Sequence, residues 1–358
     1  MRRLHAFGGV LLIVLIAYLL LWPVDVYPVA WQAPRNDGYT GAFERNDRLA
    51  ELALVQLAGR HGPEDAAVGP DGLIYTTSHS GDILKIDVDN SVSVFAKTGG
   101  RPLGLEFAKD GMLFVADAHR GLLGIDRAGH VEVLADRTVD GSPILYADDV
   151  DIASDGTVYF SDASMRFGAL ASGGTLEGSV RDLMEHSASG RVLKYDRKTK
   201  QTTEFAAGLA FANGVAVSED DAAILVAETG NYRVWRFPID GTPGVVVLRD
   251  LPGFPDNINP AHDGTFWVGL VSPRNALMDR LSDVPFARRI IMRLPGFFRP
   301  APTRYGCVVR IRANGEVIET LQSPTGDFAM TTGAITLPDG RVLVTSLTEP
   351  TLGILPPR

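Results

Sequence analysis

The chain has 358 residues and a formal charge of −9, with 34 Lys and Arg against 43 Asp and Glu. This acidic balance excludes nucleic acid as an expected partner, because binding phosphate requires clustered positive charge. A single cysteine, Cys307, excludes an intrachain disulfide and a cysteine-rich zinc site. At this length, one closed all-β domain and two smaller domains are both possible.

The N-terminus carries an apolar stretch. Two arginines at positions 2 and 3 precede an uncharged run over residues 6–23, which is near the lower length limit for a membrane-spanning helix. No small-x-small cleavage site follows, so we favour an uncleaved signal anchor over residues 1–23 to a cleaved signal peptide. The chain would then be a single-pass membrane protein with its main domain on the extracytoplasmic side. Residues 24–48, rich in Pro, Gly, Asn and Asp, are predicted to form a linker.

Six acidic turns, each followed by a β-rich run, recur along the rest of the chain. They are Asp71-Gly72, Asp110-Gly111, Asp155-Gly156, Asp220-Asp221, Asp263-Gly264 and Asp339-Gly340. Asp-Gly supplies the positive φ that a tight hairpin needs, and branched and aromatic residues after it favour a strand. A recurring four-strand unit of roughly 40–50 residues is typical of a β-propeller blade. The sequence therefore predicts an all-β fold, a six-bladed β-propeller over residues 49–358.

The repeat also has an expected closure and two interruptions. Residues 51–57 are a candidate strand that would pair with the last blade and remove an exposed edge. Insertions at about residues 164–189 and 272–304 are helix-compatible, and we expect them to form a helical lid over one face. The Arg and Phe residues of the second insertion would also suit a membrane interface, and a helix packed on the propeller rim is the alternative.

Four short segments carry oxygen-donor side chains next to predicted strands in four different blades. They are Gly62-Pro63-Glu64-Asp65, Tyr146-Ala147-Asp148-Asp149-Val150-Asp151, Phe211-Ala212-Asn213-Gly214-Val215 and Phe254-Pro255-Asp256-Asn257-Ile258. Each alone is more typical of a turn than of a ligand site. Four such segments at the same relative position in four blades are harder to explain by turns alone. Carboxylate and amide oxygens without Cys or clustered His favour a hard cation such as Ca²⁺.

Several motifs together resemble the strictosidine-synthase-like propellers of the gluconolactonase superfamily, and most of all the adipocyte plasma membrane-associated protein branch. They are Gly100-Arg101-Pro102-Leu103-Gly104-Leu105, Phe114-Val115-Ala116-Asp117-Ala118, Ala147-Asp148-Asp149-Val150-Asp151, Phe211-Ala212-Asn213-Gly214-Val215, Val226-Ala227-Glu228-Thr229 and Leu251-Pro252-Gly253-Phe254-Pro255-Asp256-Asn257-Ile258. The resemblance covers roughly residues 50–355. Paraoxonases, gluconolactonases and diisopropylfluorophosphatase share this six-bladed fold and hold a catalytic Ca²⁺ in the channel.

The resemblance implies a set of functional residues in this chain. The implied Ca²⁺ ligands are Glu64, Asp148, Asn213, Asp256 and Asn257. Position 148 departs from the pattern, because relatives commonly carry Asn there. An added carboxylate should tighten Ca²⁺ binding but lower the Lewis acidity that remains for a substrate.

Two residues are candidates for the chemical step. His119 falls where paraoxonases carry a channel histidine that helps to activate water, although a rim histidine with a local hydrogen bond is the alternative. Asp256 could instead attack as a nucleophile. Asp149 is a candidate ligand for a second, structural Ca²⁺. Strictosidine synthase itself needs a catalytic Glu in its last blade, and residues 331–338 contain none, so alkaloid condensation is disfavoured.

The leading hypothesis is a membrane-anchored, Ca²⁺-dependent hydrolase of the arylesterase or lactonase type, acting on a lipophilic ester or lactone. The metal would stabilise the developing oxyanion. The alternative is a non-catalytic propeller, a binding or scaffold module with a structural Ca²⁺. Hydrolysis of sugar lactones is a third possibility, which the Phe- and Leu-rich insertion disfavours.

Overall fold

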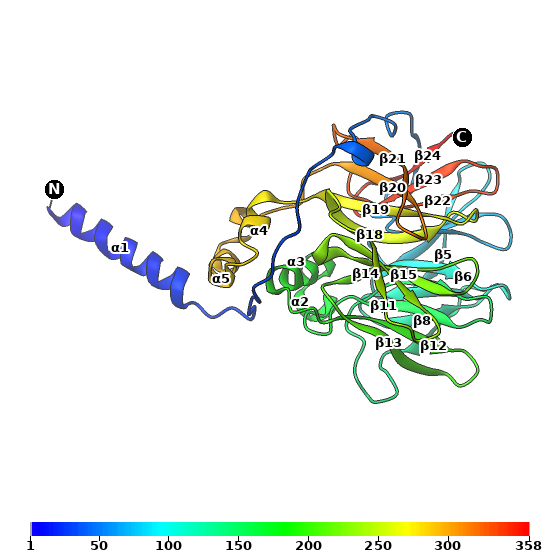
Figure 1. Cartoon of the computed structure of the whole chain (residues 1–358), viewed down its shortest axis with the longest axis horizontal. Coiled ribbons are helices and arrows are strands. Elements are labelled where there is room, and N and C mark those ends of the chain that lie inside the picture. The colour runs from blue at the N-terminus through cyan, green and yellow to red at the C-terminus, as the bar shows by residue number, and fades with distance from the viewer. Residues whose placement is uncertain (1, 358) are drawn as a thin grey trace.

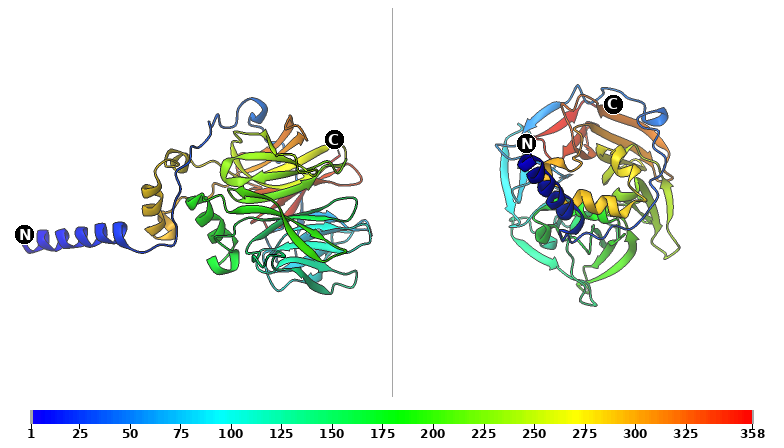
Figure 2. Two further views of the ribbon diagram at one scale, coloured as in Figure 1. Left: turned by 60° about the horizontal axis from the view of Figure 1, so that its bottom comes forward. Right: turned by 90° about the vertical axis from the view of Figure 1, so that its left-hand side faces the viewer.

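The computed structural model describes residues 2–357, and of residues 2–6 and 10 it describes only the helical backbone. Over this range the strands form six four-stranded antiparallel sheets, arranged as blades around one axis (Figures 1 and 2). Each of the six acidic turns joins the first and second strands of its blade. Gly72 in the first turn has a φ of +76°, which a residue with a side chain rarely adopts. The predicted six-bladed propeller is therefore confirmed.

The first five blades are each built from four consecutive strands. Blade 1 contains β2 (Ala66–Val68), β3 (Ile74–Thr77), β4 (Asp82–Ile86) and β5 (Val92–Lys97), and blade 2 contains β6 (Pro102–Phe107), β7 (Leu113–Asp117), β8 (Gly121–Ile125) and β9 (Val131–Ala135). Blade 3 contains β10 (Ala147–Ile152), β11 (Val158–Asp162), β12 (Gly190–Asp196) and β13 (Gln201–Leu209), and blade 4 contains β14 (Ala212–Val217), β15 (Ala223–Glu228), β16 (Arg233–Pro238) and β17 (Val245–Leu248). Blade 5 contains β18 (Gly253–Pro260), β19 (Thr265–Pro273), β20 (Gly306–Arg312) and β21 (Val317–Ser323).

Blade 6 is made from both ends of the propeller sequence. It contains β22 (Thr331–Thr336), β23 (Val342–Ser346) and β24 (Thr351–Leu355), and its fourth strand is β1 (Ala53–Gln56). Ala53 pairs with Ile354 and Gln56 with Thr351 in an antiparallel ladder. The predicted closing strand is thus confirmed, and its pairing covers the edge that β24 would otherwise expose.

Apolar side chains fill the space between neighbouring blades. Phe114 of blade 2 packs with Phe160 and Leu193 of blade 3, and all three are fully buried. Trp267 of blade 5 packs in the same way against Val344 of blade 6. Because each of these clusters contains residues of two neighbouring blades, the position of every inner strand depends on its neighbours.

The two insertions are helical and lie on the same face of the propeller (Figure 2). The first contains α2 (Ala169–Ser172) and α3 (Thr175–Glu185), and the second contains α4 (Ala276–Arg280), α5 (Pro285–Arg293) and the 3₁₀ turn η3 (Gly296–Phe298). Pro285 occupies the first turn of α5, where its missing N–H costs nothing, and α5 ends at Arg293, two residues before Pro295. The Arg288 side chain donates to the backbone carbonyl of Met184 at 3.0 Å, which ties α5 to α3.

Helix α1 (Arg2–Leu21) extends away from the propeller on this same side (Figure 1). The anchor predicted over residues 1–23 lies partly outside the description, because Met1 and the side chains of residues 2–6 and 10 are not described. Among the described residues, no helix combines the length and the apolar character that crossing a membrane requires.

The predicted linker runs along the helical insertions and contacts both of them. The Val29 amide donates to the Glu185 carbonyl of the first insertion at 2.8 Å, and the Trp31 amide donates to the Ser282 carbonyl of the second at 3.0 Å. The Trp31 ring stacks on His186 with 4.0 Å between centroids.

Residues 41–43 and 229–231 form two further 3₁₀ turns, η1 (Gly41–Phe43) and η2 (Thr229–Asn231).

Asp182 holds the first insertion against the propeller. Its side chain is buried and accepts hydrogen bonds from the Ser164 hydroxyl at 2.6 Å and the Ser189 hydroxyl at 3.3 Å. Its other carboxyl oxygen has no partner. Burial raises the pKa of Asp182 to about 7.

We predict that α3 loosens as the pH rises through neutrality. An Asp with a raised pKa stabilises the fold fully below its unfolded pKa of about 4, and this stability is lost as the pH approaches 7. Hydrogen exchange of the α3 amides, corrected for intrinsic rates, should therefore be faster at pH 8 than at pH 5.5. Asp182→Asn should abolish the difference, whereas Glu177→Gln, at an exposed position of the same helix, should keep it. A pH-independent α3 in the unmodified protein would contradict this assignment.

Candidate functional site

Irregularities in the inner strands place the predicted donor residues in the channel. The ladder of β10 with β11 is interrupted between Ala147 and Val150, and that of β14 with β15 between Ala212 and Val215. The β18 ladder is interrupted in the same way between Pro255 and Ile258. A bulge bends its strand and re-aims the side chains within it. The residues inside these three bulges are Asp148, Asp149, Asn213, Gly214, Asp256 and Asn257.

Close backbone contact brings two of these bulges together. A Cβ atom added to Gly214 would lie 2.4 Å from both the Asp256 carbonyl oxygen and the Ile258 nitrogen. Only glycine therefore lets β14 approach β18 at this point. The approach places Asn213 beside Asp256, and the Asn213 side chain hydrogen-bonds to the Asp256 carboxyl group.

The structure gathers the five predicted ligands at one level of the channel. Glu64 lies two residues before the start of β2, and its backbone carbonyl accepts from the Asn257 side chain at 3.1 Å and from the Thr332 hydroxyl at 2.5 Å. Glu64, Asp148, Asn213 and Asp256 line a cavity of about 170 Å³, and Asn257 is fully buried. We call Glu64, Asp148, Asn213, Asp256 and Asn257 the oxygen cradle.

Three oxygens of the oxygen cradle are buried and accept no hydrogen bond. They are Oε2 of Glu64, Oδ1 of Asn213 and Oδ1 of Asn257. Burying an acceptor without a donor costs about 1–3 kcal/mol, so such groups are rare in folded proteins. Three of them in one cradle indicate a ligand that accepts electron pairs from oxygen.

Burial, with some help from neighbouring negative charges, raises the pKa values of the cradle carboxylates. Burial, followed by the charges of Asp256 and Asp148, raises the pKa of Glu64 well above its usual value. Burial also raises the pKa of Asp256 to about 7, against the hydrogen bond from Asn213. A bound cation would remove this repulsion and favour the charged forms.

The residues present fit a hard divalent cation. In the described part of the chain, no three His, Cys, Asp or Glu side chains form a metal site by themselves. An ion would therefore need the amide oxygens of Asn213 and Asn257 together with the carboxylates. This all-oxygen set matches the ligand preference of Ca²⁺ and does not match that of zinc or copper.

A second pair of acids lies deeper in the channel and is tied to protein donors. Asp65 accepts from the Leu105 amide at 3.0 Å and from the Asn259 side chain at 2.9 Å. Asp149 accepts from the Val215 amide at 2.8 Å and from its neighbour Val150 at 2.8 Å. Every oxygen of this pair has a donor, so the pair joins the inner strands of different blades. The predicted role of Asp149 in a second Ca²⁺ site stays a prediction.

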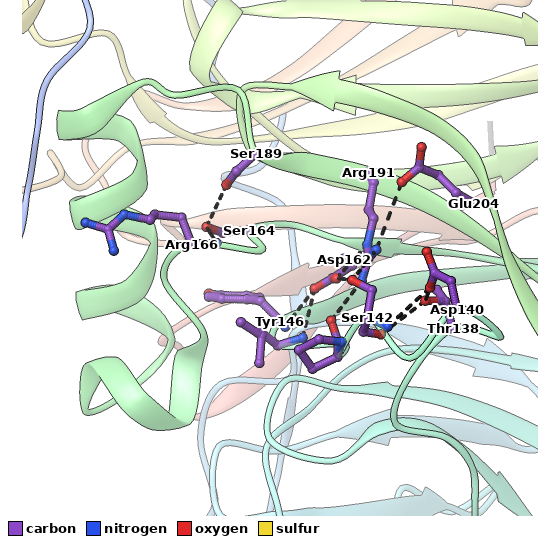
Figure 3. Close-up of polar contacts among 12 residues, drawn as sticks. Thr138, Asp140, Ser142, Tyr146, Asp162, Ser164, Arg166, Ser189, Arg191 and Glu204 are labelled. Atoms are coloured by element: carbon purple, nitrogen blue, oxygen red, sulfur yellow. Dashed lines mark hydrogen bonds and ion pairs between the residues drawn. The ribbon is translucent and has the colours of Figure 1, made fainter.

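An acid at the end of the second strand fixes the loop before the inner strand in three blades. Asp162 accepts from the Tyr146 amide at 2.9 Å and pairs with Arg191, which in turn binds the Ser142 hydroxyl (Figure 3). Asp117 in blade 2 and Glu228 in blade 4 accept in the same way from the amides of residues 101 and 210. These contacts hold the start of each inner strand, and therefore the oxygen cradle, in place.

Apolar side chains form the walls of the cavity above the oxygen cradle. They come from the blades, from α3, α4 and α5, and from the segment that follows α1. The principal ones are Trp31, Leu103, Tyr146, Leu176, Val180, Leu183, Met184, Phe211, Tyr232, Phe254, Met278, Ile291, Met292, Met330 and Leu347. A ligand in this cavity would contact mainly hydrocarbon and aromatic surface, although Thr175, Ser179 and Asn275 of the insertions also line it.

His119 and Arg101 lie on neighbouring loops of blades 1 and 2, outside the residues that line this cavity. Nε2 of His119 is buried and has no hydrogen-bond partner, and its backbone amide donates to Asp117 at 3.0 Å. Burial, followed by the charge of Arg101, lowers the pKa of the nearby His79. Of the two candidate catalytic residues, the structure brings Asp256 but not His119 to the cavity.

The sequence pattern did not single out three residues of this region. Trp31 lies in a Pro-rich segment, where no motif marks it as a functional residue. Tyr146 belongs to one of the oxygen-donor segments and Arg101 to one of the family motifs, but neither pattern indicates a role for them. The sequence feature that could have identified Arg101 is a charged residue between Gly100 and an apolar inner strand.

The chain matches known families over two regions. Residues 148–242 match strictosidine synthase, and residues 41–86 match the N-terminal region of strictosidine synthase-like proteins. An adipocyte plasma membrane-associated protein from Salmo salar is 31% identical over 96% of this chain and 87% of that protein. Protein strictosidine synthase-like 10 from Arabidopsis thaliana is 31% identical over 86% of this chain and 88% of that protein.

Solved structures share the fold at lower identity. A gluconolactonase from Xanthomonas campestris superimposes with a TM-score of 0.62 at 18% identity, covering 94% of this chain and 99% of that chain. Regucalcin from Agrobacterium tumefaciens, described as a calcium-binding protein, gives a TM-score of 0.59 at 16% identity, covering 85% and 93%. At these identities the similarity is one of fold.

We predict that Asp65, one of the deep pair, contributes more to the free energy of unfolding than the exposed Asp71 does. Asp65→Ala would leave the Leu105 amide and the Asn259 side chain without acceptors in a buried position, so unfolding should cost about 3 kcal/mol less. Asp71→Ala, which removes an exposed ion pair with Lys85, should cost less than about 1 kcal/mol. Denaturant unfolding in EDTA measures both changes, and equal losses for the two variants would refute the proposed role of Asp65.

Proposed function

Because the chain belongs to the strictosidine synthase-like family, as its motifs predicted, we propose that it is a Ca²⁺-dependent hydrolase of lipophilic esters or lactones. The observation that carries the proposal is the oxygen cradle, with its three unpaired oxygens, at the polar end of an apolar cavity. The fold neighbours add support, since they include a gluconolactonase and a calcium-binding regucalcin.

The oxygen cradle would hold the metal through Glu64, Asp148, Asn213, Asp256 and Asn257. A bound Ca²⁺ supplies Lewis acidity that stabilises the negative charge developing on a carbonyl oxygen.

Asp256 is the residue best placed to handle the proton. It lines the cavity, and a bound cation would keep its carboxylate ionised and able to act on a substrate or a water molecule. The Asn213 side chain orients its carboxyl group. His119 would act only if its loop brought the unpaired Nε2 to the substrate.

The walls of the cavity select for lipophilic substrates. Leu103, Phe211 and Met330 of the propeller line the cavity together with Met292 and Leu183 of the insertions. The insertions would act as a lid that excludes water and bulk solvent from the ester. The predominance of apolar side chains in these walls favours a lipophilic substrate over a sugar lactone. Alkaloid condensation is not proposed, because β22 carries no Glu.

We also propose that the protein associates with a membrane through its helical face. The relatives named for the plasma membrane support this, and so do large exposed apolar side chains on one side of the molecule. Leu21 of α1 is 77% exposed, and Phe297 and Phe298 of η3 are 81% and 65% exposed. The Arg293 side chain donates to the Trp22 carbonyl at 2.7 Å, so the end of α1 is joined to the second insertion. The single-pass topology remains part of this proposal.

Hydrolysis should depend on Ca²⁺ and on the oxygen cradle. We expect turnover of phenyl acetate and of a medium-chain lactone that EDTA abolishes and Ca²⁺ restores. Glu64→Gln and Asn213→Ala should each lower kcat/KM at least 100-fold, because they remove oxygens that hold the ion. Asp71→Ala, far from the cavity, should retain the activity of the unmodified protein.

The same experiment separates the hydrolase from the binding module. If Ca²⁺ raises Tm but no substrate is turned over, the propeller is a binding or scaffold module with a structural ion. If Ca²⁺ affects neither Tm nor hydrolysis, both the hydrolase proposal and the binding-module alternative are wrong.

Membrane association should depend on the exposed aromatic pair. We expect the full-length chain to float with phosphatidylcholine vesicles in a density gradient, and Phe297→Ser with Phe298→Ser to lower the bound fraction at least threefold. Val88→Ser, which changes an exposed apolar residue in the turn between β4 and β5, should leave the bound fraction unchanged. Equal flotation of all three proteins would show that η3 does not contribute.

A further inference from the structure

Arg101 is a buried arginine without a charged partner in direct contact. It lies directly before β6, and its side chain is 3% exposed. Nη1 donates to the Pro102 carbonyl at 3.1 Å, but Nε and Nη2 have no acceptor. Among the described residues, no carboxylate oxygen lies within 4.0 Å of its nitrogens. Burying a guanidinium in this way is costly unless nearby negative charge offsets it.

The largest offsetting charge comes from Glu64 of the oxygen cradle. Burial lowers the pKa of Arg101, and the negative charges of Glu64, Asp148 and Asp117 act in the opposite direction. The effect is mutual, since burial and Asp256 raise the pKa of Asp148 while Arg101 lowers it. Arg101 therefore lies within the field of the carboxylates without being bonded to them.

The ionisable groups around Arg101 carry an excess of negative charge. The cradle contains three carboxylates, Glu64, Asp148 and Asp256, and Asp117 adds a fourth beside the guanidinium, so ionised carboxylates outnumber the one cation among them. A divalent cation would offset most of this excess negative charge. The deeper acids Asp65 and Asp149 are held separately by their own hydrogen-bond donors.

We propose that Arg101 is the internal counter-ion of the oxygen cradle, which offsets the carboxylates when no metal is bound and thereby weakens metal binding. This inference rests on the proposed Ca²⁺ site. Arginine remains charged at all accessible pH values and cannot ligate a cation, so it acts on the ion only by repulsion and by partial neutralisation of the ligands. It would also account for the tolerance of a carboxylate at position 148.

The first test measures Ca²⁺ affinity by isothermal titration calorimetry on the full-length chain. Arg101→Met should tighten binding at least tenfold, and Arg101→Lys, which keeps the charge, should stay within about threefold of the unmodified protein. The matched control is Arg120→Met, which removes a cation from the next loop of the same face, where its side chain binds the Thr98 carbonyl. This control should change the affinity less than twofold. A residue with a merely structural role would weaken Ca²⁺ binding when removed, so an unchanged or weaker affinity in Arg101→Met would overturn the proposal.

The second test needs no metal and keeps the inference separate from the proposed function. In EDTA, Arg101→Met should lower Tm, because three carboxylates then lie together without a cation. Adding Asp148→Asn should recover at least half of that loss, since it removes one of the repelling charges. Without recovery, the guanidinium would matter only for packing and the proposal would be wrong.

The two tests give distinct outcomes when combined. If the unmodified protein binds no Ca²⁺ but Asp148→Asn still rescues Arg101→Met, the hydrolase proposal fails and the counter-ion role stands. If Arg101→Met is unfolded in EDTA, saturating Ca²⁺ should refold it. Failure to refold in Ca²⁺ would contradict the counter-ion role.

Discussion

Negative charge buried around the propeller axis is the constraint on which the rest of the site depends. Inner strands bring several carboxylates into a space that excludes water, where each must find donors or raise its pKa. Every oxygen of the deep pair, Asp65 and Asp149, accepts a hydrogen bond, in part from backbone amides of neighbouring blades, although burial still raises both pKa values. One level above, the oxygen cradle has only a few donors and a single nearby guanidinium. This difference between two adjacent levels separates a structural network from a centre that can take up a cation.

The channel combines this charged floor with apolar walls from distant parts of the chain. Blades supply the oxygens, whereas the insertions and the segment around Trp31 supply most of the hydrocarbon surface. Trp31 stacks on His186, which directly follows α3, so the segment after α1 is part of the cavity wall. In the proposed hydrolase, chemistry and substrate preference would therefore be set by different segments, and the insertions could vary without disturbing the oxygen cradle.

The sequence predicted those features that local patterns encode. Asp-Gly turns marked the six blades, residues 51–57 marked the closing strand, and the four donor segments marked residues that do lie together. It could not show that Asp65 and Asp149 are bound by amides of other blades, because those bonds depend on how the inner strands bulge and approach. For the same reason a role for Arg101 could not be predicted from the sequence, because the carboxylates near its side chain are distant in sequence. The placement of His119 outside the cavity lining depends on loop geometry that spacing does not encode.

The pairing of β1 with β24 has a consequence for synthesis on the ribosome. Blades 1 to 5 are each continuous in sequence, so each can form its hairpins as it emerges. The β1 strand, made early, must wait with an unpaired edge until residues 351–355 have left the exit tunnel. During translation the ring therefore stays open, and its aggregation-prone edges are exposed for most of that time. A nascent chain arrested just short of its last blade would be a natural substrate for chaperones.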